Sequence, residues 1–156
     1  MTMLDEMSPA SADLIFAALA YALENAGLSD AGFTPFAFSD SPKGRGLTRF
    51  LAGEGTDLQE CLAAGRTALR VVEHDVTCVA LAWDGYYTHE GRRSEAVFVE
   101  GYQIGHDRGV MLAQRYTRQG GTLSMEGSPV LIDEPVPLVQ SRRGAVAFVD
   151  QETRSS

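Results

Sequence analysis

Each of the three histidines in this chain is followed by a carboxylate, in the pairs His74-Asp75, His89-Glu90 and His106-Asp107. An imidazole next to a carboxylate can serve in acid–base catalysis, and several such groups together can bind a metal ion. In the sheet predicted below, the first and third pairs lie at one end and the second pair at the other. A metal site made of His74, Asp75, His106 and Asp107 is therefore one hypothesis. The four residues follow no established metal motif, and we favour the simpler interpretation that all three pairs lie in turns, where Asp and Gly are common.

A second group of side chains combines tyrosines with carboxylates. They occur at alternate positions of three β-prone segments, so neighbouring strands would bring them onto one face of a sheet. Tyrosine offers a large rigid surface with a polar end, and mixed aromatic and polar faces are typical of binding sites and interfaces. Two carboxylates in a cleft could also carry out hydrolysis. The predicted binding residues are Asp84, Tyr86, Phe98, Glu100, Tyr102, Gln114 and Tyr116.

The sequence contains no other motif of an enzyme or a nucleotide-binding protein. Neither a GxSxG nucleophile motif nor a GxGxxG motif that opens a helix occurs. The segment SPKGRG, residues 41–46, has two cations and two glycines, but it lacks the phosphate-binding pattern and precedes a predicted strand. We therefore expect a non-enzymatic protein without a cofactor. Catalysis at the tyrosine–carboxylate face is the alternative.

The composition is typical of one soluble domain. The chain has 156 residues, of which 44% are hydrophobic and 22% charged, and its net charge of −8 disfavours a nucleic-acid or membrane partner. Its longest early apolar run, residues 14–23, is too short to cross a bilayer. Cys61 and Cys78 lie in apolar segments without zinc-site spacing, which indicates reduced core residues of a cytoplasmic protein. We expect a single domain over residues 1–149 and a disordered tail over residues 150–156.

Apolar residues at helical spacing predict two helices. Ser8 and Pro9 begin the first helix as N-cap and first helical residue, and Gly27 ends it. This helix is apolar nearly all round, which indicates that it is covered on more than one side, within the domain or by a second subunit. The second helix is predicted over residues 57–72, with residues 56–59 as a capping box.

Segments rich in β-branched and aromatic residues fill most of the remaining chain. Residues 35–39 and 47–52 form a predicted hairpin, and residues 76–88, 94–103 and 109–117 form a predicted three-stranded antiparallel meander. Residues 118–129 are predicted as a loop, with short strands at 130–133 and 145–149. This order predicts an α+β fold, in which two helices pack on one face of a mainly antiparallel sheet.

The two turns of the meander determine which residues share a face. We centre the first turn on Glu90 and the second near His106, so that the odd-numbered residues form an apolar face toward the helices. The even-numbered residues then form the tyrosine–carboxylate face, which is open, covered by the last strands, or in contact with a second copy. The apolar face consists of Val79, Leu81, Trp83, Val97, Val99, Met111 and Ala113.

These features predict a soluble cytoplasmic module that binds a protein partner or itself, as a dimer, through the tyrosine–carboxylate face. The alternative is a small-molecule-binding protein or enzyme that uses the same face as a pocket, closed by the loop of residues 118–129. Asp84 and Glu100 would set the polarity of such a pocket.

Overall fold

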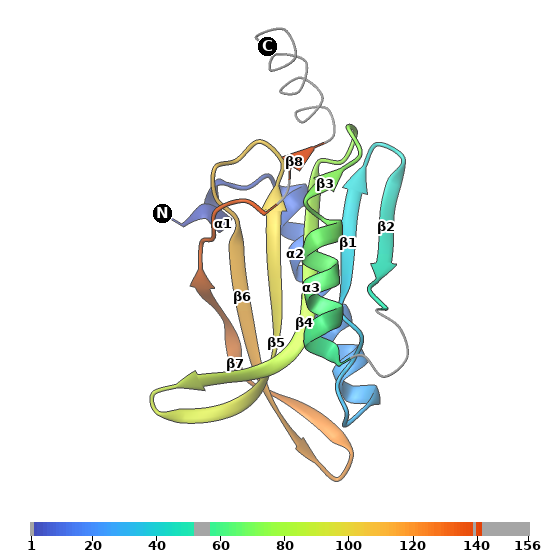
Figure 1. Ribbon diagram of the computed structural model, residues 1–156. Helices are drawn as coiled ribbons and strands as arrows, with labels where there is room; N and C mark the ends of the chain where they lie inside the picture. Colours follow the sequence, from blue (N-terminus) through green and yellow to red (C-terminus); the bar gives the residue numbers. More distant parts are fainter. Residues whose placement is uncertain (1, 52–56, 139, 142–156) are drawn as a thin grey trace, which may run out of the picture.

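The computed structural model describes residues 2–51, 57–138 and 140–141, and its main element is a six-stranded antiparallel sheet in the order β2-β1-β4-β5-β6-β7 (Figure 1). The helices are α1 (Met3–Glu6), α2 (Pro9–Leu28) and α3 (Leu58–Ala68). The strands of the sheet are β1 (Phe36–Ser41), β2 (Gly44–Arg49), β4 (Cys78–His89), β5 (Arg92–Gln103), β6 (Val110–Gln119) and β7 (Thr122–Asp133). A separate parallel pair joins β3 (Val71–Val72) to β8 (Gln140–Ser141). The predicted α+β class and the antiparallel sheet are confirmed.

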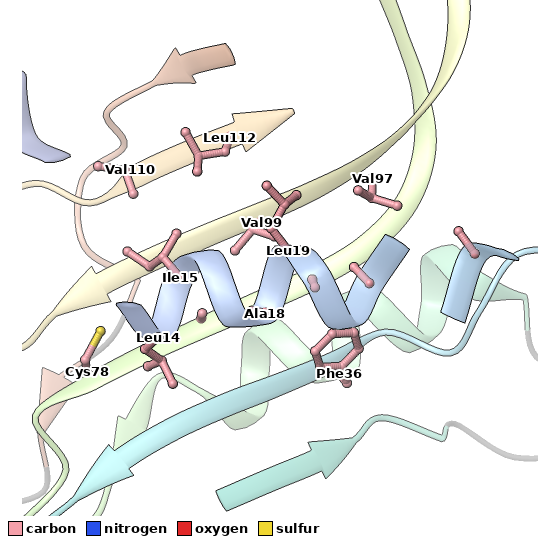
Figure 2. Close-up of a cluster of buried hydrophobic side chains, with 14 of the residues drawn as sticks. Leu14, Ile15, Ala18, Leu19, Phe36, Cys78, Val97, Val99, Val110 and Leu112 are labelled. Carbon is pink, nitrogen blue, oxygen red and sulfur yellow. The ribbon is translucent and has the colours of Figure 1, made fainter. Parts of the chain in front are cut away.

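Helix α2 packs along one face of the sheet and forms the main core with β4 and β5 (Figure 2). Ser8 caps the helix as predicted, because its side chain accepts a hydrogen bond from the backbone N–H of Ser11. Close approach of the helix depends on a glycine in β5. A Cβ atom on Gly101 would lie 2.4 Å from Cγ1 of Ile15, so only glycine lets Ile15 reach full burial here. Burial of side chains such as Ile15 contributes about 1.5–3 kcal/mol each.

One side of α2 faces solvent. Asp13, Phe16, Ala20 and Glu24 are exposed at helical spacing, and Phe16 is the large apolar residue among them. Within the described chain, the helix is therefore covered on one side rather than all round. It ends at Leu28, with Gly27 inside its last turn instead of after it.

Helix α3 packs on the face of the sheet opposite α2 (Figure 1). Leu62 of this helix packs against Leu81 of β4, whereas Ala80 and Ala82 belong to the core under α2. Residues 78–82 are consequently buried without alternation, as in any strand that is covered on both faces. The prediction that both helices share one face was wrong in this respect.

The pairing of β5 differs by one residue from the predicted register. Trp83 of β4 pairs with Phe98, where a turn centred on Glu90 would pair it with Val97. The turn has two residues, Glu90 and Gly91, both with positive φ (51° and 78°), which is the backbone of the tight hairpin turn that favours glycine. The β5–β6 register is also shifted by one, because Phe98 pairs with Ala113 and not with Gln114. Because the two shifts cancel, the residues of β4 and β6 share faces as predicted. Every side chain of β5 points to the face opposite the predicted one.

Residues 122–133 form strand β7 at the edge of the sheet, so the predicted loop over residues 118–129 was wrong. Gly120 and Gly121 have positive φ (58° and 82°) and join β6 to β7 through a tight turn. The short strand predicted at residues 130–133 is the end of β7. Leu123 lies next to the end of α2, where its Cβ is 3.9 Å from the position a Cβ would take on Gly27. This segment thus covers the end of the helix and does not close a pocket on the meander.

The second helix is shorter than predicted, because Val71 and Val72 form strand β3 instead. Its N-cap is Asp57, which accepts a hydrogen bond from the backbone N–H of Glu60. The predicted strand at residues 145–149 and the predicted tail at 150–156 lie outside the described residues.

Both cysteines are free and buried, as predicted. Burial raises the pKa of the Cys78 thiol to about 11, so it remains protonated at neutral pH. Among the described residues, no helix combines the length and apolar character needed to cross a membrane.

Candidate functional site

The predicted binding residues lie on both faces of the sheet. Asp84, Tyr86, Gln114 and Tyr116 share the side of α2, whereas Phe98, Glu100 and Tyr102 share the side of α3. Asp84 and Glu100 therefore cannot act together on one substrate, and the hypothesis of a carboxylate pair on one face was wrong. The single tyrosine–carboxylate face is replaced by two groups, each built around one carboxylate.

The first group fastens α3 to the sheet. Glu100 is 1% exposed, and its Oε2 accepts hydrogen bonds from Tyr102 Oη and, at 2.9 Å, from Arg66 Nη1 of α3. The guanidinium of Arg66 also lies over the ring of Trp83, 5.1 Å from its centre. Burial, together with the bond to Glu100, raises the pKa of Tyr102 above its ordinary value. We name Arg66, Glu100 and Tyr102 the Glu100 cluster, and its carboxylate is too enclosed and too fully paired to receive a ligand.

Gln114 has a structural role as well. It is fully buried, and its Nε2 donates to the backbone carbonyls of Arg115, Glu126 and Gly127. These carbonyls belong to the irregular stretch between β6 and β7. The amide thus satisfies backbone groups that the distorted ladder leaves without partners.

The second group is centred on Asp84. Tyr116 on β6 donates a hydrogen bond of 2.8 Å to Asp84 Oδ1, across the intervening strand β5. Burial of the carboxyl group raises the pKa of Asp84, and the nearby Glu95 acts in the same direction, while the bond from Tyr116 lowers it. Burial also raises the pKa of Tyr116, and its bond to Asp84 adds to this effect. A carboxylate with a raised pKa in a partly open position is a common mark of a functional site.

Arg118 is the cation nearest to this group. It donates a hydrogen bond of 3.0 Å to the carbonyl of Ser29 and forms ion pairs with Asp30 at 3.5 Å and Glu95 at 3.7 Å. With Asp84, three carboxylates stand around one guanidinium. The group therefore has an excess of negative charge.

Two hollows meet at Asp84. The acidic hollow has a volume of about 130 Å³, and its lining includes Asp30, Asp84, Glu95 and the backbone around Gly32. The apolar hollow has a volume of about 260 Å³ and is lined by Pro35, Leu58, Gln59, Leu62, Trp83, Asp84, Gly85, Tyr86, Phe98 and Met111. Leu58, Asp84, Gly85 and Tyr86 belong to both. We call the two hollows together the Asp84 site.

The fold places the Asp84 site just beyond Ala82, where the pairing of β4 with β1 ends. Beyond Glu95 and Tyr116, the last residues that pair β5 with β6, the β4–β5 hairpin swings away from the β6–β7 hairpin, and the first turn of α3 stands beside this divergence (Figure 1). Two glycines keep the hollows open. A Cβ on Gly32 would lie 2.9 Å from Leu58 Cδ1, and one on Gly85 would lie 3.2 Å from Phe98 Cε2. Side chains at either position would crowd the walls of the site.

The histidines do not form the proposed metal site. Asp75 pairs with Lys43 at 3.7 Å, while His106 contacts the Gln103 amide at 2.7 Å through Nε2 and the sulfur of Met3 at 3.5 Å through Nδ1. Within residues 2–51, 57–138 and 140–141, no three His, Cys, Asp or Glu side chains are arranged to bind a metal ion. The hypothesis of a site on His74, Asp75, His106 and Asp107 was wrong.

Arg66, Glu95 and Arg118 were missing from the predicted site. Arg118 follows Tyr116 by two residues and therefore lies on the same side of β6, a signal that strand alternation contains. Arg66 follows Leu62 by four residues on the packed side of α3. It becomes recognisable only when α3 is placed over Glu100.

Comparison of the chain with protein-family models, with curated proteins and with solved structures finds no match.

Proposed function

We propose that this protein is a non-enzymatic binding module and that the Asp84 site receives its ligand. The observation that supports this most directly is the meeting of an apolar hollow and an acidic hollow at one partly buried carboxylate. Concave sites with apolar walls and a few polar groups are where proteins bind small groups. The site also contains a large exposed aromatic, since Tyr86 is 61% exposed at its rim.

Binding is better supported than catalysis. Hydrolysis by two carboxylates requires both to face one substrate, and Asp84 and Glu100 lie on opposite faces of the sheet. Asp84 is also already hydrogen-bonded to Tyr116. A carboxylate held in this way can orient and neutralise a ligand without any further group.

A second copy of the chain is the alternative partner. The tyrosine–carboxylate face, which was the predicted contact surface, cannot serve in such a dimer. Tyr102 and Tyr116 are only 3% and 1% exposed and cannot meet another subunit. The exposed stripe of α2 around Phe16, which is 43% exposed, is the better surface for a dimer. We further propose a reducing, cytoplasmic location, which the two free buried cysteines support.

Native mass spectrometry of the purified protein tests these proposals with two matched variants. Tyr86→Ala removes a shared wall of the Asp84 site, and Phe16→Ala removes the exposed aromatic of α2. We expect the wild type to carry an added mass that Tyr86→Ala loses and Phe16→Ala keeps. A dimer that Phe16→Ala splits would support self-association. A bare monomer whose Trp83 fluorescence responds to no member of a fragment library would contradict the binding-module proposal.

A further inference from the structure

The apolar hollow has walls of a kind that attract organic cations. Trp83, Tyr86 and Phe98 line it, and aromatic faces attract positive charge through the ring quadrupole. The chain's own side chains already use this attraction, because Arg93 lies over Tyr86 at 4.1 Å and Arg66 over Trp83 at 5.1 Å. Trp83 is engaged by Arg66 and by the stacked ring of Phe98, whose centre is 5.5 Å away, so a further cation with an apolar stem would meet chiefly Tyr86, which is 61% exposed.

The adjoining acidic hollow complements such a cation. Asp30, Asp84 and Glu95 line it, and the two nearby cations, Arg118 and the Arg93 that lies over Tyr86, are fewer than the three carboxylates. The whole chain is acidic as well, with a net charge of −8, so its long-range field attracts cations and repels anions. An anionic or a strictly neutral ligand would leave this excess of negative charge unpaired.

The dimensions limit the ligand to the size of a side chain. The two volumes, about 130 and 260 Å³, are each small and together lie near the lower end of the range typical of drug-sized pockets, which starts at about 300 Å³. The rim is exposed, with Tyr86 61% and Leu58 37% accessible, so the rest of a larger partner can lie outside. A lysine or arginine side chain has this form, with an apolar stem and a charged end.

Resting on the proposed function, we infer that the Asp84 site binds a basic side chain of a partner protein. The stem lies against Tyr86 and Leu58, which line both hollows, and the ammonium or guanidinium group reaches Asp84. Arginine fits better than lysine, because its planar guanidinium stacks on aromatic rings and pairs with carboxylates through two hydrogen bonds.

Trp83 is the only tryptophan in the chain and lines the apolar hollow, so its fluorescence reports occupancy directly. The probes are a capped pentapeptide, acetyl-Gly-Leu-Arg-Leu-Gly-amide, the same peptide with citrulline or glutamate in place of arginine, and n-butylammonium. Citrulline keeps the shape of arginine without its charge. We expect the arginine peptide to bind at least 10-fold more tightly than the citrulline peptide and to weaken as salt is added. The glutamate peptide should give no response.

Asp84→Asn should reduce the affinity for the arginine peptide to that of the citrulline peptide. Asparagine keeps an acceptor for Tyr116, so the variant should fold, and its circular dichroism spectrum verifies this. Glu95→Gln should cause a smaller loss in the same direction. Asp107→Asn removes an exposed carboxylate outside the site and should leave the affinity unchanged.

The outcomes separate this inference from the proposed function. Equal binding of the arginine and citrulline peptides, with a response of Trp83 to both, would overturn the cationic specificity and leave the binding site standing. Binding of n-butylammonium as tight as that of the arginine peptide would overturn the protein partner in favour of a free amine. Absence of any fluorescence response, to these probes and to the fragment library, would overturn both proposals.

Discussion

Tyr116 reaches across strand β5 to place its hydroxyl 2.8 Å from the carboxylate of Asp84. The pair joins two strands that are not neighbours, and it holds Asp84 where the apolar and acidic hollows meet. The carboxylate is retained there although burial raises its pKa, which means that its charged form is disfavoured in the folded state. Residues that reduce stability in this way are frequent at functional sites.

We therefore expect Asp84→Asn to stabilise the protein at neutral pH. The folded-state pKa of Asp84 lies above the unfolded value, so the wild type loses stability as the pH rises from about 4 through the raised pKa, and the variant does not. The gain at pH 7 should be on the order of 0.5 kcal/mol, since the group is partly exposed and solvent screens part of the effect. Urea unfolding at pH 4 and pH 7 measures it. An equal difference between the two proteins at both pH values would refute the assignment.

Removing one partner from the Glu100 cluster should destabilise the protein, in contrast to the stabilising substitution of Asp84. Arg66→Met leaves the buried carboxylate of Glu100 without its cation, and breaking a buried pair costs roughly 3–5 kcal/mol. Arg66 is 34% exposed, so water can replace part of the interaction and we expect about 2–3 kcal/mol. The double variant Arg66→Met/Glu100→Gln should lose less than the sum of the two single variants. Additive losses in urea unfolding would mean that the two residues do not interact.

The two buried tyrosines predict a loss of stability at alkaline pH. The pKa values of Tyr102 and Tyr116 are raised above the ordinary value, first by burial and then by their carboxylate partners. Since their folded pKa is higher than the unfolded value of about 10, their contribution is complete below pH 10 and is lost as the pH rises above it. Ultraviolet titration should show two of the five tyrosines of the chain ionising only on unfolding. The variant Tyr102→Phe/Tyr116→Phe lacks both hydroxyl groups. Relative to its stability in urea at neutral pH, it should therefore unfold at a higher pH than the wild type.

The turn between β4 and β5 predicts a stabilising substitution. Glu90 has φ of 51°, which is unfavourable for a side chain that is neither glycine nor asparagine, and its contact with His89 is a long 3.8 Å. Glu90→Asn creates the Asn-Gly pair that tight hairpin turns prefer, and we expect a gain of about 0.5–1 kcal/mol. Thermal unfolding measures the gain, with Glu24→Gln, which removes the same charge at an exposed position of α2, as the control. A loss of stability would contradict the assigned turn geometry.

This turn also explains why the sequence identified the strands but not the faces. Ser8-Pro9 and the apolar spacing of residues 15–26 were sufficient to predict α2, and β-branched and aromatic residues were sufficient for β4, β5 and β6. Glu-Gly is a weak turn signal compared with Asn-Gly or Asp-Gly. A shift of one residue in this turn moved Phe98, Glu100 and Tyr102 to the opposite face.

Strand β7 was missed for a different reason. It lies at the edge of the sheet and most of its residues are exposed, so it needs no apolar alternation. Pro129, Gly127 and two serines are tolerated there, since an edge strand has one side free of ladder hydrogen bonds. Because β7 was not predicted, the strand that flanks Tyr116 and Arg118 was missing from the predicted sheet. The acidic hollow beside these two residues could therefore not be predicted either.

The position of α3 determines the width of the apolar hollow, and Gly65 sets that position. A Cβ on Gly65 would lie 2.7 Å from the ring of Phe50, so the helix approaches the sheet more closely than alanine permits. In an exposed helix, Gly→Ala stabilises by about 1 kcal/mol, whereas overpacking a buried contact costs about 1–3 kcal/mol.

We expect Gly65→Ala to be destabilising overall and to shift the emission of Trp83, because α3 carries Leu58 and Leu62 of the hollow. Ala64→Gly, at an exposed position of the same helix, should lose about 1 kcal/mol from helix propensity alone and leave the emission unchanged. If Gly65→Ala instead stabilised the protein with Trp83 unaffected, α3 would be free to move away from the sheet, and the walls of the Asp84 site would not be fixed in the free protein.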